Sequence, residues 1–204
     1  MITKIGKHRV KHGDIRDGID DLMESDIADF VYTDPPWGQG SLRFWQTLNK
    51  KDTGQEYRDV IYDDFMDFFF SILAKYSRDK VVVEYGEKWS NDIIALSGRH
   101  GFYHNGVCKS LYRSGAKLLT LDMHFLSRSK PFSVSQDIVD DCINKRGFDL
   151  VNTLFEKLCP QDAEIILDPL CGMGYTAQAT VNRNLSFRGN ELNKKRLDKT
   201  IARL

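Results

Sequence analysis

The chain has 204 residues, a length that suits one domain with a sizeable core and is short for two. Its 29 Lys and Arg residues balance its 29 Asp and Glu residues, which argues against binding to nucleic acid by overall charge alone but does not exclude local basic patches. The apolar runs are far too short to cross a bilayer, and the N-terminus lacks the apolar stretch of a secretory signal, so we expect a cytoplasmic protein. The cysteines show no metal-ligand spacing, and we expect no metal site and a buried free thiol at Cys108, Cys142, Cys159 and Cys171.

Seven short segments have the apolar content and the flanking turn signals of buried strands. They cover residues 9–12, 29–33, 80–85, 105–112, 117–126, 164–168 and 186–191. Helical periodicity occurs in several gaps, around residues 15–23, 65–73, 93–96 and 150–158, and a further helix is expected over 174–184. Strands that alternate with helices predict an α/β protein with a mainly parallel sheet and helices on both faces.

One pair of strand-like runs is joined by the short polar link Arg113-Ser114-Gly115-Ala116, which predicts an antiparallel hairpin. No internal repeat, low-complexity segment or Pro-rich linker divides the sequence, so we expect a single domain over residues 1–204. On α/β sheets, ligands bind beyond the carboxyl ends of the strands. Motifs that directly follow predicted strands should therefore meet at one edge of the sheet.

The first such motif is Asp34-Pro35-Pro36-Trp37, which follows the apolar run that ends at Thr33. Two consecutive prolines stiffen the loop and remove two N–H donors. The Asp34 carboxylate and the Pro35 carbonyl are neighbouring acceptors that could take both hydrogens of an amino group and free its lone pair for in-line attack. Trp37 supplies a flat face against which a base could stack. The alternative is a Pro-rich turn with a buried Trp, and the place of the motif after a strand favours the catalytic interpretation.

A second motif follows the apolar run at residues 164–167 and contains a glycine-bearing turn before a helix start. Gly172 and Gly174 would let the backbone approach a nucleoside closely, but the turn lacks the full GxGxxG pattern and the P-loop lysine, so NAD and ATP are poorer fits. Glu191 ends the next strand at about 20 residues beyond the turn, where such folds hold ribose hydroxyls. The whole motif is Asp168-Pro169-Leu170-Cys171-Gly172-Met173-Gly174-Tyr175-Thr176.

A third motif, His12-Gly13-Asp14, ends another predicted strand. Taken alone, Asp14 is best explained as the cap of a helix that starts at Ile15 or Arg16.

Together these residues resemble the amino-methyltransferases of nucleic acids, which act on N6 of adenine or N4 of cytosine. The catalytic motif of that family, (D/N/S)-P-P-(Y/F/W), is matched by Asp34 through Trp37. Its cofactor motif, often D-P-F-x-G-S-G-T-T, is matched in part, because Leu170, Met173 and Tyr175 replace the usual Phe, Ser and first Thr. A family pattern near the N-terminus resembles Gly13-Asp14 loosely, and Lys130-Pro131 matches a family Lys-Pro motif without its usual His.

The resemblance implies a fold and a motif order. The catalytic motif precedes the cofactor motif, which is similar to the circularly permuted order of the beta class. In that arrangement the chain starts on the third strand of the usual count and ends after the second. We therefore expect a Rossmann-like, seven-stranded, mainly parallel sheet with one antiparallel hairpin, in which the last two strands lie beside the first.

The resemblance also implies S-adenosylmethionine as cofactor. Asp168, Gly172 and Gly174 would line its methionine end, Glu191 would hold the ribose, and Asp14 would contact the adenine edge. The remaining members of the implied cofactor site are Lys130, Pro169, Leu170, Cys171 and Thr176.

Family members usually carry a target-recognition region of substantial length, whereas here only residues 38–62 and the hairpin are available. The chain then reads a short sequence, reads loosely, or borrows recognition from a partner. We expect residues 38–62 to be a substrate-contacting insertion that its glycines allow to move; the alternative is a flap over the cofactor. The expected nucleic-acid contacts are Arg43, Lys50, Lys51 and Arg58 for phosphates, and Phe44, Trp45 and Tyr57 for stacking. Residues 99–130 form a second basic stretch.

The sequence thus predicts methyl transfer to N6 of adenine in DNA, on a base that is flipped out or single-stranded. The choice of adenine follows from the Asp that begins the loop, because cytosine enzymes more often begin it with Ser. N6-adenine methylation of RNA and N4-cytosine methylation of DNA are the alternatives. Rivals from other classes are a cofactor-binding inactive subunit and a methyltransferase of protein glutamine or a small amine, whose loop usually begins with Asn. We expect a monomer or a homodimer.

Overall fold

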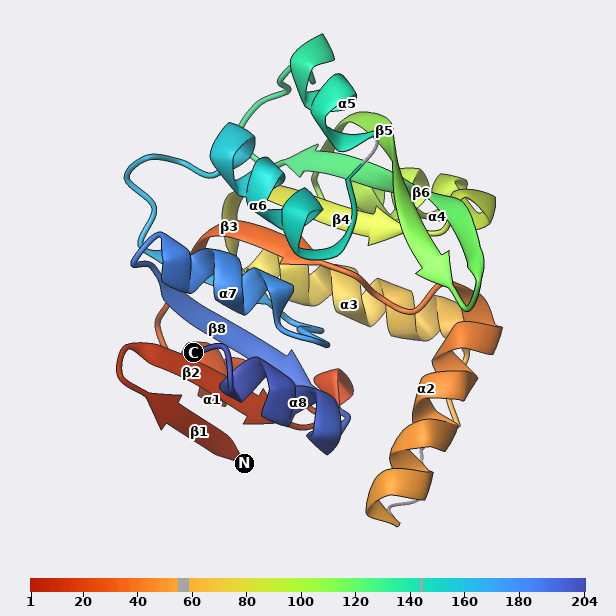
Figure 1. Cartoon of the computed structure of the whole chain (residues 1–204), viewed down its shortest axis with the longest axis vertical. Coiled ribbons are helices and arrows are strands. Elements are labelled where there is room, and N and C mark those ends of the chain that lie inside the picture. Colours follow the sequence, from red (N-terminus) through yellow and green to blue (C-terminus); the bar gives the residue numbers. More distant parts are fainter. Residues whose placement is uncertain (55–58, 144) are drawn as a thin grey trace.

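The computed structural model describes residues 1–54, 59–143 and 145–204, and these form one eight-stranded sheet. The strands are β1 (Ile2–Ile5), β2 (His8–His12), β3 (Ala28–Thr33), β4 (Ser77–Tyr85), β5 (Tyr103–Ser114), β6 (Lys117–Ser127), β7 (Ile165–Asp168) and β8 (Ser186–Glu191). Their order across the sheet is β1-β2-β8-β7-β3-β4-β6-β5 (Figure 1). The five strands that are neighbours in the middle of this order, β2, β8, β7, β3 and β4, run parallel. β1 pairs antiparallel with β2, and β6 pairs antiparallel with β4 and β5.

All seven expected strands are present, and the predicted α/β fold with its antiparallel β5–β6 hairpin is confirmed. The strand count is corrected from seven to eight, because the sequence patterns do not predict β1. This strand lies at the edge of the sheet, and none of its four residues is fully buried. An edge strand of this kind needs no apolar run, so hydrophobic patterning does not reveal it.

The last two strands of the chain lie in the middle of the sheet. β8 pairs with β2, and β7 pairs with both β8 and β3, all in parallel. The predicted permuted order is therefore confirmed. It also brings the carboxyl ends of β2, β3, β4, β7 and β8 to one edge, where the sequence motifs follow them.

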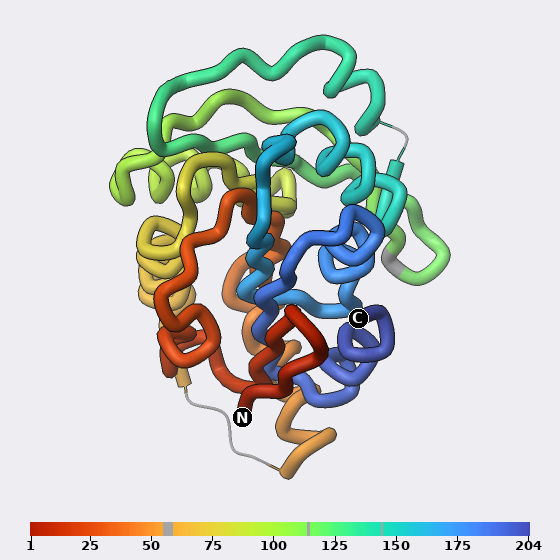
Figure 2. The backbone as a smooth tube through the Cα atoms, turned by 90° about the vertical axis from the view of Figure 1, so that its left-hand side faces the viewer, coloured from red at the N-terminus to blue at the C-terminus, as the bar shows by residue number. Residues whose placement is uncertain are grey.

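Helices cover both faces of the sheet (Figure 2). They are η1 (Ile15–Asp17), α1 (Asp20–Met23), α2 (Gly38–Thr53), α3 (Tyr62–Tyr76), η2 (Glu87–Trp89), α4 (Ser90–Arg99), α5 (Gln136–Cys142), α6 (Gly147–Leu158), α7 (Tyr175–Asn182) and α8 (Lys194–Ile201). The core under α1, α3 and α4 includes Phe69, and the core under α5 and α6 includes Phe155, which packs edge-on against Phe30. Within the described part of the chain, no helix combines the length and the apolar character that a membrane span requires.

The first part of the segment at residues 38–62, which we expect to be a substrate-contacting insertion, forms the 16-residue helix α2 along one side of the molecule (Figure 1). The helix turns Leu42 inward together with Gln46 and Asn49, so polar side chains occupy positions where helical patterning would show apolar ones. Its last turn is tied to α8, because Asp52 accepts a hydrogen bond from Asn193 at 2.9 Å and pairs with Lys195. Two predicted contacts of this segment, Tyr57 and Arg58, lie outside the described residues.

Candidate active site

A cavity of about 390 Å³ lies where the carboxyl ends of the parallel strands meet α2 and the β5–β6 hairpin. This volume is in the range of small-molecule sites. It brings together residues that are far apart in the sequence, including loops after β2, β3, β7 and β8. The predicted site residues that line it are Asp14, Asp34, Pro35, Pro36, Trp37, Trp45, Asp168, Leu170, Cys171, Gly172, Thr176 and Glu191.

Residues 34–37, which we call the Asp34 loop, are fixed by hydrogen bonds at both ends. The Trp37 indole N–H donates to Oδ1 of Asp34 at 2.9 Å, and the Tyr62 hydroxyl donates to the carbonyl of Pro36 at 2.9 Å. Behind the loop, Gly38 has φ +75°, and a Cβ there would lie 2.9 Å from the ring of Trp89. Only glycine fits this position, so the loop is packed as well as stiffened by its prolines.

The Trp37 ring also contacts the hairpin. It meets Tyr112 of β5 edge-to-face, with ring centroids 4.8 Å apart. Both rings line the cavity, so the loop and the hairpin together form an aromatic wall on which a planar ring could stack.

The Asp34 side chain lines the cavity and is exposed to solvent there. Loss of solvation raises its pKa well above the usual range, and the negative charge of Glu84 adds to this rise. The Arg196 guanidinium and the hydrogen bond from Trp37 act in the opposite direction. Solvent that enters the cavity reduces the rise, and a bound cation would reduce it further.

Residues 168–174, which we call the Asp168 loop, are held mainly by backbone and hydroxyl donors. Asp168 is almost fully buried; it accepts hydrogen bonds from the Thr176 hydroxyl at 2.6 Å and from the Leu170 N–H at 3.2 Å. Burial raises the pKa of Asp168 to about 7 despite these bonds, and the charge of Glu191 contributes. Gly172 has φ +49°, a backbone conformation that favours glycine, and a Cβ there would lie 2.7 Å from the Arg196 guanidinium, which would have to move.

Glu191, at the end of β8, connects the Asp168 loop with the start of α8. Its Oε2 accepts from the Gly172 N–H at 2.9 Å and its Oε1 from the Asn193 N–H at 2.7 Å. Burial raises the pKa of Glu191, while Arg196 opposes the rise. Each carboxylate oxygen has a second lone pair, so hydroxyl groups of a ligand can still donate to Glu191.

Asp14 forms the helix cap that the sequence predicts. Its carboxylate caps η1 by accepting from the Arg16 N–H at 3.0 Å, and it pairs with the Arg16 side chain at 2.5 Å. It nevertheless lines the cavity, beside Leu192. Capping therefore does not remove Asp14 from the surface that a ligand would contact.

Three residues of the predicted cofactor site do not line the cavity. Lys130 follows β6, which runs against the parallel strands, so it lies at the opposite edge, next to Ser129, whose N–H donates to Asp79. At Gly174, φ is +78° and a Cβ would lie 2.7 Å from the backbone of Thr200, so this glycine serves the contact between α7 and α8. The carbonyl of Pro169 accepts a hydrogen bond from Asn190.

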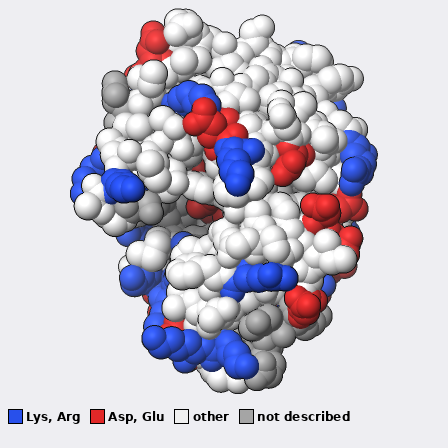
Figure 3. Space-filling model, turned by 90° about the vertical axis from the view of Figure 1, so that its right-hand side faces the viewer, with Lys and Arg blue, Asp and Glu red and all other residues white. Residues whose placement is uncertain are grey.

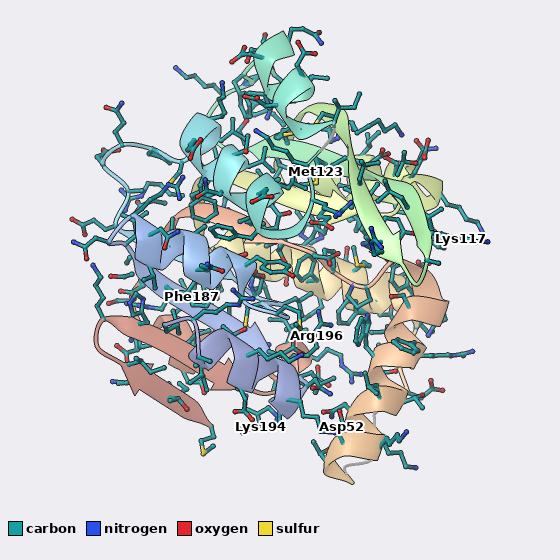
Figure 4. All side chains as sticks on the ribbon, in the orientation of Figure 1. Asp52, Lys117, Met123, Phe187, Lys194 and Arg196 are labelled. Carbon is teal, nitrogen blue, oxygen red and sulfur yellow. The ribbon has the colours of Figure 1, made fainter. Side chains whose placement is uncertain are left out.

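The predicted nucleic-acid residues divide between two faces of α2. Trp45 points inward and lines the cavity, whereas Arg43, Lys50 and Lys51 are exposed on the outer face. The Arg196 guanidinium lies over the Trp45 ring at 4.2 Å and so connects α8 with α2 (Figure 4). On the face of the molecule shown in Figure 3, Lys and Arg side chains form separate groups with acidic side chains between several of them.

Sequence reasoning missed Glu84 and Arg196, which both line the cavity. Glu84 follows the apolar run Val81-Val82-Val83 near the end of β4, just as Asp34 follows β3. An acid at the end of a predicted strand was therefore an available signal. Arg196 gave no such signal, because it lies in the first turns of the polar helix α8. Its Nε atom is buried and has no hydrogen-bond partner among the described residues.

No protein-family model matches this sequence, and no curated protein matches it. Solved structures do match its fold. The crystal structure of the M1.HpyAVI–SAM complex is 16% identical with a TM-score of 0.68, over 96% of this chain and 98% of that one. TTHA0409 from Thermus thermophilus, complexed with S-adenosyl-L-methionine, is 16% identical with a TM-score of 0.63, over 96% and 92%.

The PvuII DNA methyltransferase, described as cytosine-N4-specific, is 14% identical with a TM-score of 0.64, over 96% of this chain and 85% of that one. At these identities the matches establish architecture. The chain shares the Rossmann-like α/β fold of these proteins over nearly its whole length.

Proposed function

We propose that this chain is an S-adenosylmethionine-dependent methyltransferase that modifies the exocyclic amino group of a nucleic-acid base, N6 of adenine in DNA. The observation that carries this proposal is the shared cavity. The cavity places the Asp34 loop, whose oxygens could accept amino hydrogens, beside the carboxylates of Asp168 and Glu191. The close-packed glycine turn at Gly172 adjoins them.

The chemistry of the cavity fits this cofactor. S-adenosylmethionine carries a sulfonium and an ammonium cation, a carboxylate, ribose hydroxyls and an adenine ring. Asp168 and Glu191 are buried acids that form no salt bridge with the described residues, and burial raises the pKa of each. A cationic ligand would supply the missing counter-charge. When bound, the cofactor supplies a methyl group already activated by the sulfonium.

The chain's own residues would bind and orient the acceptor. Trp37 occupies Oδ1 of Asp34, which leaves Oδ2 to accept one amino hydrogen, and the Pro35 carbonyl is the nearest further acceptor along the loop. Two such bonds draw the nitrogen lone pair away from the ring and toward the methyl group. Positioning of this kind lowers the barrier because it removes the entropy cost of alignment.

Adenine in DNA is the preferred target, and cytosine N4 is the alternative with specific support. The Asp that begins the loop favours adenine, whereas the PvuII enzyme of the same fold is cytosine-N4-specific. RNA is a further candidate substrate. An inactive cofactor-binding subunit, or a methyltransferase of a protein glutamine or small amine, would share the cavity but would modify no base. A cytoplasmic location and a partner for target recognition stay predictions.

Mass spectrometry of nucleosides tests the target directly. Purified protein is incubated with isotopically labelled S-adenosylmethionine and with unmethylated DNA, single-stranded DNA or RNA. We expect labelled N6-methyladenine from DNA. Labelled N4-methylcytosine, or label in RNA alone, would replace the preferred target with an alternative. Absence of labelled base from every nucleic acid would reject nucleic-acid methylation.

Calorimetry tests the cofactor separately. We expect micromolar or tighter binding of S-adenosylmethionine, which corresponds to about −8 kcal/mol or better. Heat with NAD or ATP and none with S-adenosylmethionine or its demethylated product would contradict the assignment.

A further inference from the structure

The Asp34 loop has an acidic neighbour on the adjacent strand. β3 and β4 are parallel, and Thr33 lies opposite Val83 in their register. The next residues, Asp34 and Glu84, therefore reach the edge of the sheet side by side, since neighbouring strands are about 4.8 Å apart. Both carboxyl groups line the cavity. Each affects the other electrostatically, and Glu84 is the largest charge contribution to the raised pKa of Asp34.

Each of these two carboxylates is held by one aromatic donor. Trp37 donates to Oδ1 of Asp34 at 2.9 Å, and the buried Tyr32 hydroxyl donates to Oε2 of Glu84 at 2.6 Å. Among the described residues, no donor reaches the second oxygen of either group, and neither group forms a salt bridge. The two free oxygens are the acceptors that an amino group with two hydrogens would meet in this cavity.

The proposed reaction requires a proton acceptor. The amino nitrogen forms a bond to the methyl carbon while the bond from that carbon to sulfur breaks and leaves its electron pair on sulfur. The nitrogen then carries a positive charge and must release one of its two hydrogens as a proton to give the neutral methylamino product. Asp34 orients this nitrogen in the proposed function.

We propose that Glu84, rather than the Pro35 carbonyl, is the acceptor of the second amino hydrogen through its free oxygen and then takes up this proton, which makes it a second catalytic residue. The inference rests on the proposed function and deepens it. The proton passes from nitrogen to the Glu84 carboxylate and leaves through the open cavity when product dissociates, which restores the carboxylate.

The electrostatics of the cavity favour this transfer. Burial raises the pKa of Glu84, and the hydrogen bond from Tyr32 opposes the rise. The charged groups around it are Asp34 beside it, Asp168 on β7, and Arg196, which faces Asp34 from α8. Two adjacent carboxylates cannot both ionise easily, so the pair gains by taking up one proton. Protonation of the pair becomes still more favourable after methyl transfer, because the positive charge on sulfur, which stabilises both carboxylates, is then lost.

The test compares Glu84→Gln with a matched control, Glu87→Gln. Glu87 lies three residues farther along, is exposed and pairs with Lys109. We expect Glu84→Gln to lower kcat by ~10²-fold or more, the scale of general-base catalysis. Calorimetric Kd values for S-adenosylmethionine should stay within a few-fold of wild type. Glu84→Asp should recover part of kcat, and Glu87→Gln should change nothing.

The pH profile separates a catalytic role from a structural one. The pair must be ionised to act, so kcat falls as pH falls through its raised pKa. In Glu84→Gln, Asp34 loses its negative neighbour, so its pKa drops and the acidic limb of the remaining activity should move to lower pH. A variant that merely destabilises the fold would lower Tm and leave that limb in place.

Carbon-13 NMR of carboxyl-labelled Glu gives a readout independent of activity. The Glu84 signal, identified by its loss in Glu84→Gln, should titrate at higher pH than that of Glu87 and should shift to lower pH in Asp34→Asn. A Glu84 signal with an ordinary pKa that ignores Asp34→Asn, or a Glu84→Gln variant with wild-type kcat and acidic limb, overturns the inference. If wild-type protein methylates no base, the proposed function fails instead.

Discussion

The Asp34 loop and the Asp168 loop both line the cavity, but the fold supports them in different ways. The first is held by prolines and by aromatic side chains, with Tyr62 bonded to its backbone and Trp37 packed on Tyr112. The second is held by buried carboxylates, because Glu191 accepts from the backbone of the turn and Asp168 from Thr176.

The two loops therefore differ in what they contribute to the cavity: one positions a carboxylate and the other supplies negative charge. The aromatic support of the Asp34 loop fixes the place of one carboxylate, which stays open to the cavity. The Asp168 loop instead concentrates negative charge behind a glycine turn. Changes in the first loop should therefore affect turnover more than binding, and changes in the second should affect binding and its pH dependence.

The largest expected effect comes from Asp34→Ala. If this carboxylate orients the acceptor nitrogen, kcat should fall by ~10³-fold or more, while the Kd for S-adenosylmethionine stays near wild type. Single-turnover methylation and calorimetry measure the two quantities. Asp162→Ala, at an exposed loop position before β7, is the control and should leave both unchanged. Wild-type turnover in Asp34→Ala would make the loop structural only and would remove the contrast between the loops.

The second prediction concerns the pH dependence of cofactor binding. The folded-state pKa of Asp168 is raised to about 7, so this carboxyl is largely protonated below neutral pH. A cationic ligand prefers the ionised form, so its affinity should rise by up to ~10-fold per pH unit below that pKa, with proton release on binding. Calorimetry in buffers of different ionisation enthalpy measures the proton count. Asp168→Asn should flatten this dependence, and an equally steep dependence in that variant would place the titrating group elsewhere.

The same shift affects stability with a definite sign. Because the folded-state pKa of Asp168 lies above its unfolded value, the folded state binds the extra proton between the two. The contribution of Asp168 to the stability of the protein without ligand should therefore fall as pH rises from about 4 toward neutral. Chemical denaturation of Asp168→Asn should show a smaller loss over that range.

The third prediction extends the comparison to α2, which continues the chain from the Asp34 loop. Neutralising its outer face with Arg43→Gln, Lys50→Gln and Lys51→Gln together should weaken DNA binding by ~10-fold. Each phosphate contact that is lost should also reduce the salt slope by about 0.9. Lys4→Gln, on the edge strand β1, is the control. Unchanged DNA affinity across a salt series would direct attention to the basic residues of 99–130.

The smallest expected effect is that of Tyr62→Phe. It removes the hydrogen bond to the Pro36 carbonyl and the contact with the buried Tyr85 hydroxyl, which together should cost about 1–3 kcal/mol of stability and lower kcat several-fold. Cofactor affinity should not change. Thermal denaturation and steady-state kinetics test this, with Tyr103→Phe, an exposed tyrosine on β5, as the control. A lower cofactor affinity in Tyr62→Phe would show that the two loops are not independently supported.

The strands β3, β4 and β7 could be predicted from the sequence because each contains an uninterrupted apolar run, and Asp34 and Asp168, which end two of those runs, could be found for the same reason. The assignment of Lys130 to the cofactor site rests on the Lys-Pro motif alone. The predicted hairpin already requires one of its strands to run against the others, and Lys130 follows that strand, so it ends at the opposite edge of the sheet. The role of Gly174 could not be predicted, since its neighbour Thr200 comes from a helix without an apolar pattern. Nothing local in the sequence places Arg196 over Trp45, which depends on how α8 and α2 meet.

The central place of β7 and β8 also constrains the order of folding during synthesis. When β2 and β3 have left the ribosome, the two strands that belong between them have not yet been made. The β1–β2 hairpin therefore has no partner strand to dock on until β8 is complete. The Asp168 loop and Glu191 are made at the same late stage, so a nascent chain can form the β3–β4–β6–β5 half before the cavity is complete. The sheet and the cavity should therefore be completed in one step, when β7 and β8 have been synthesised and insert between β2 and β3.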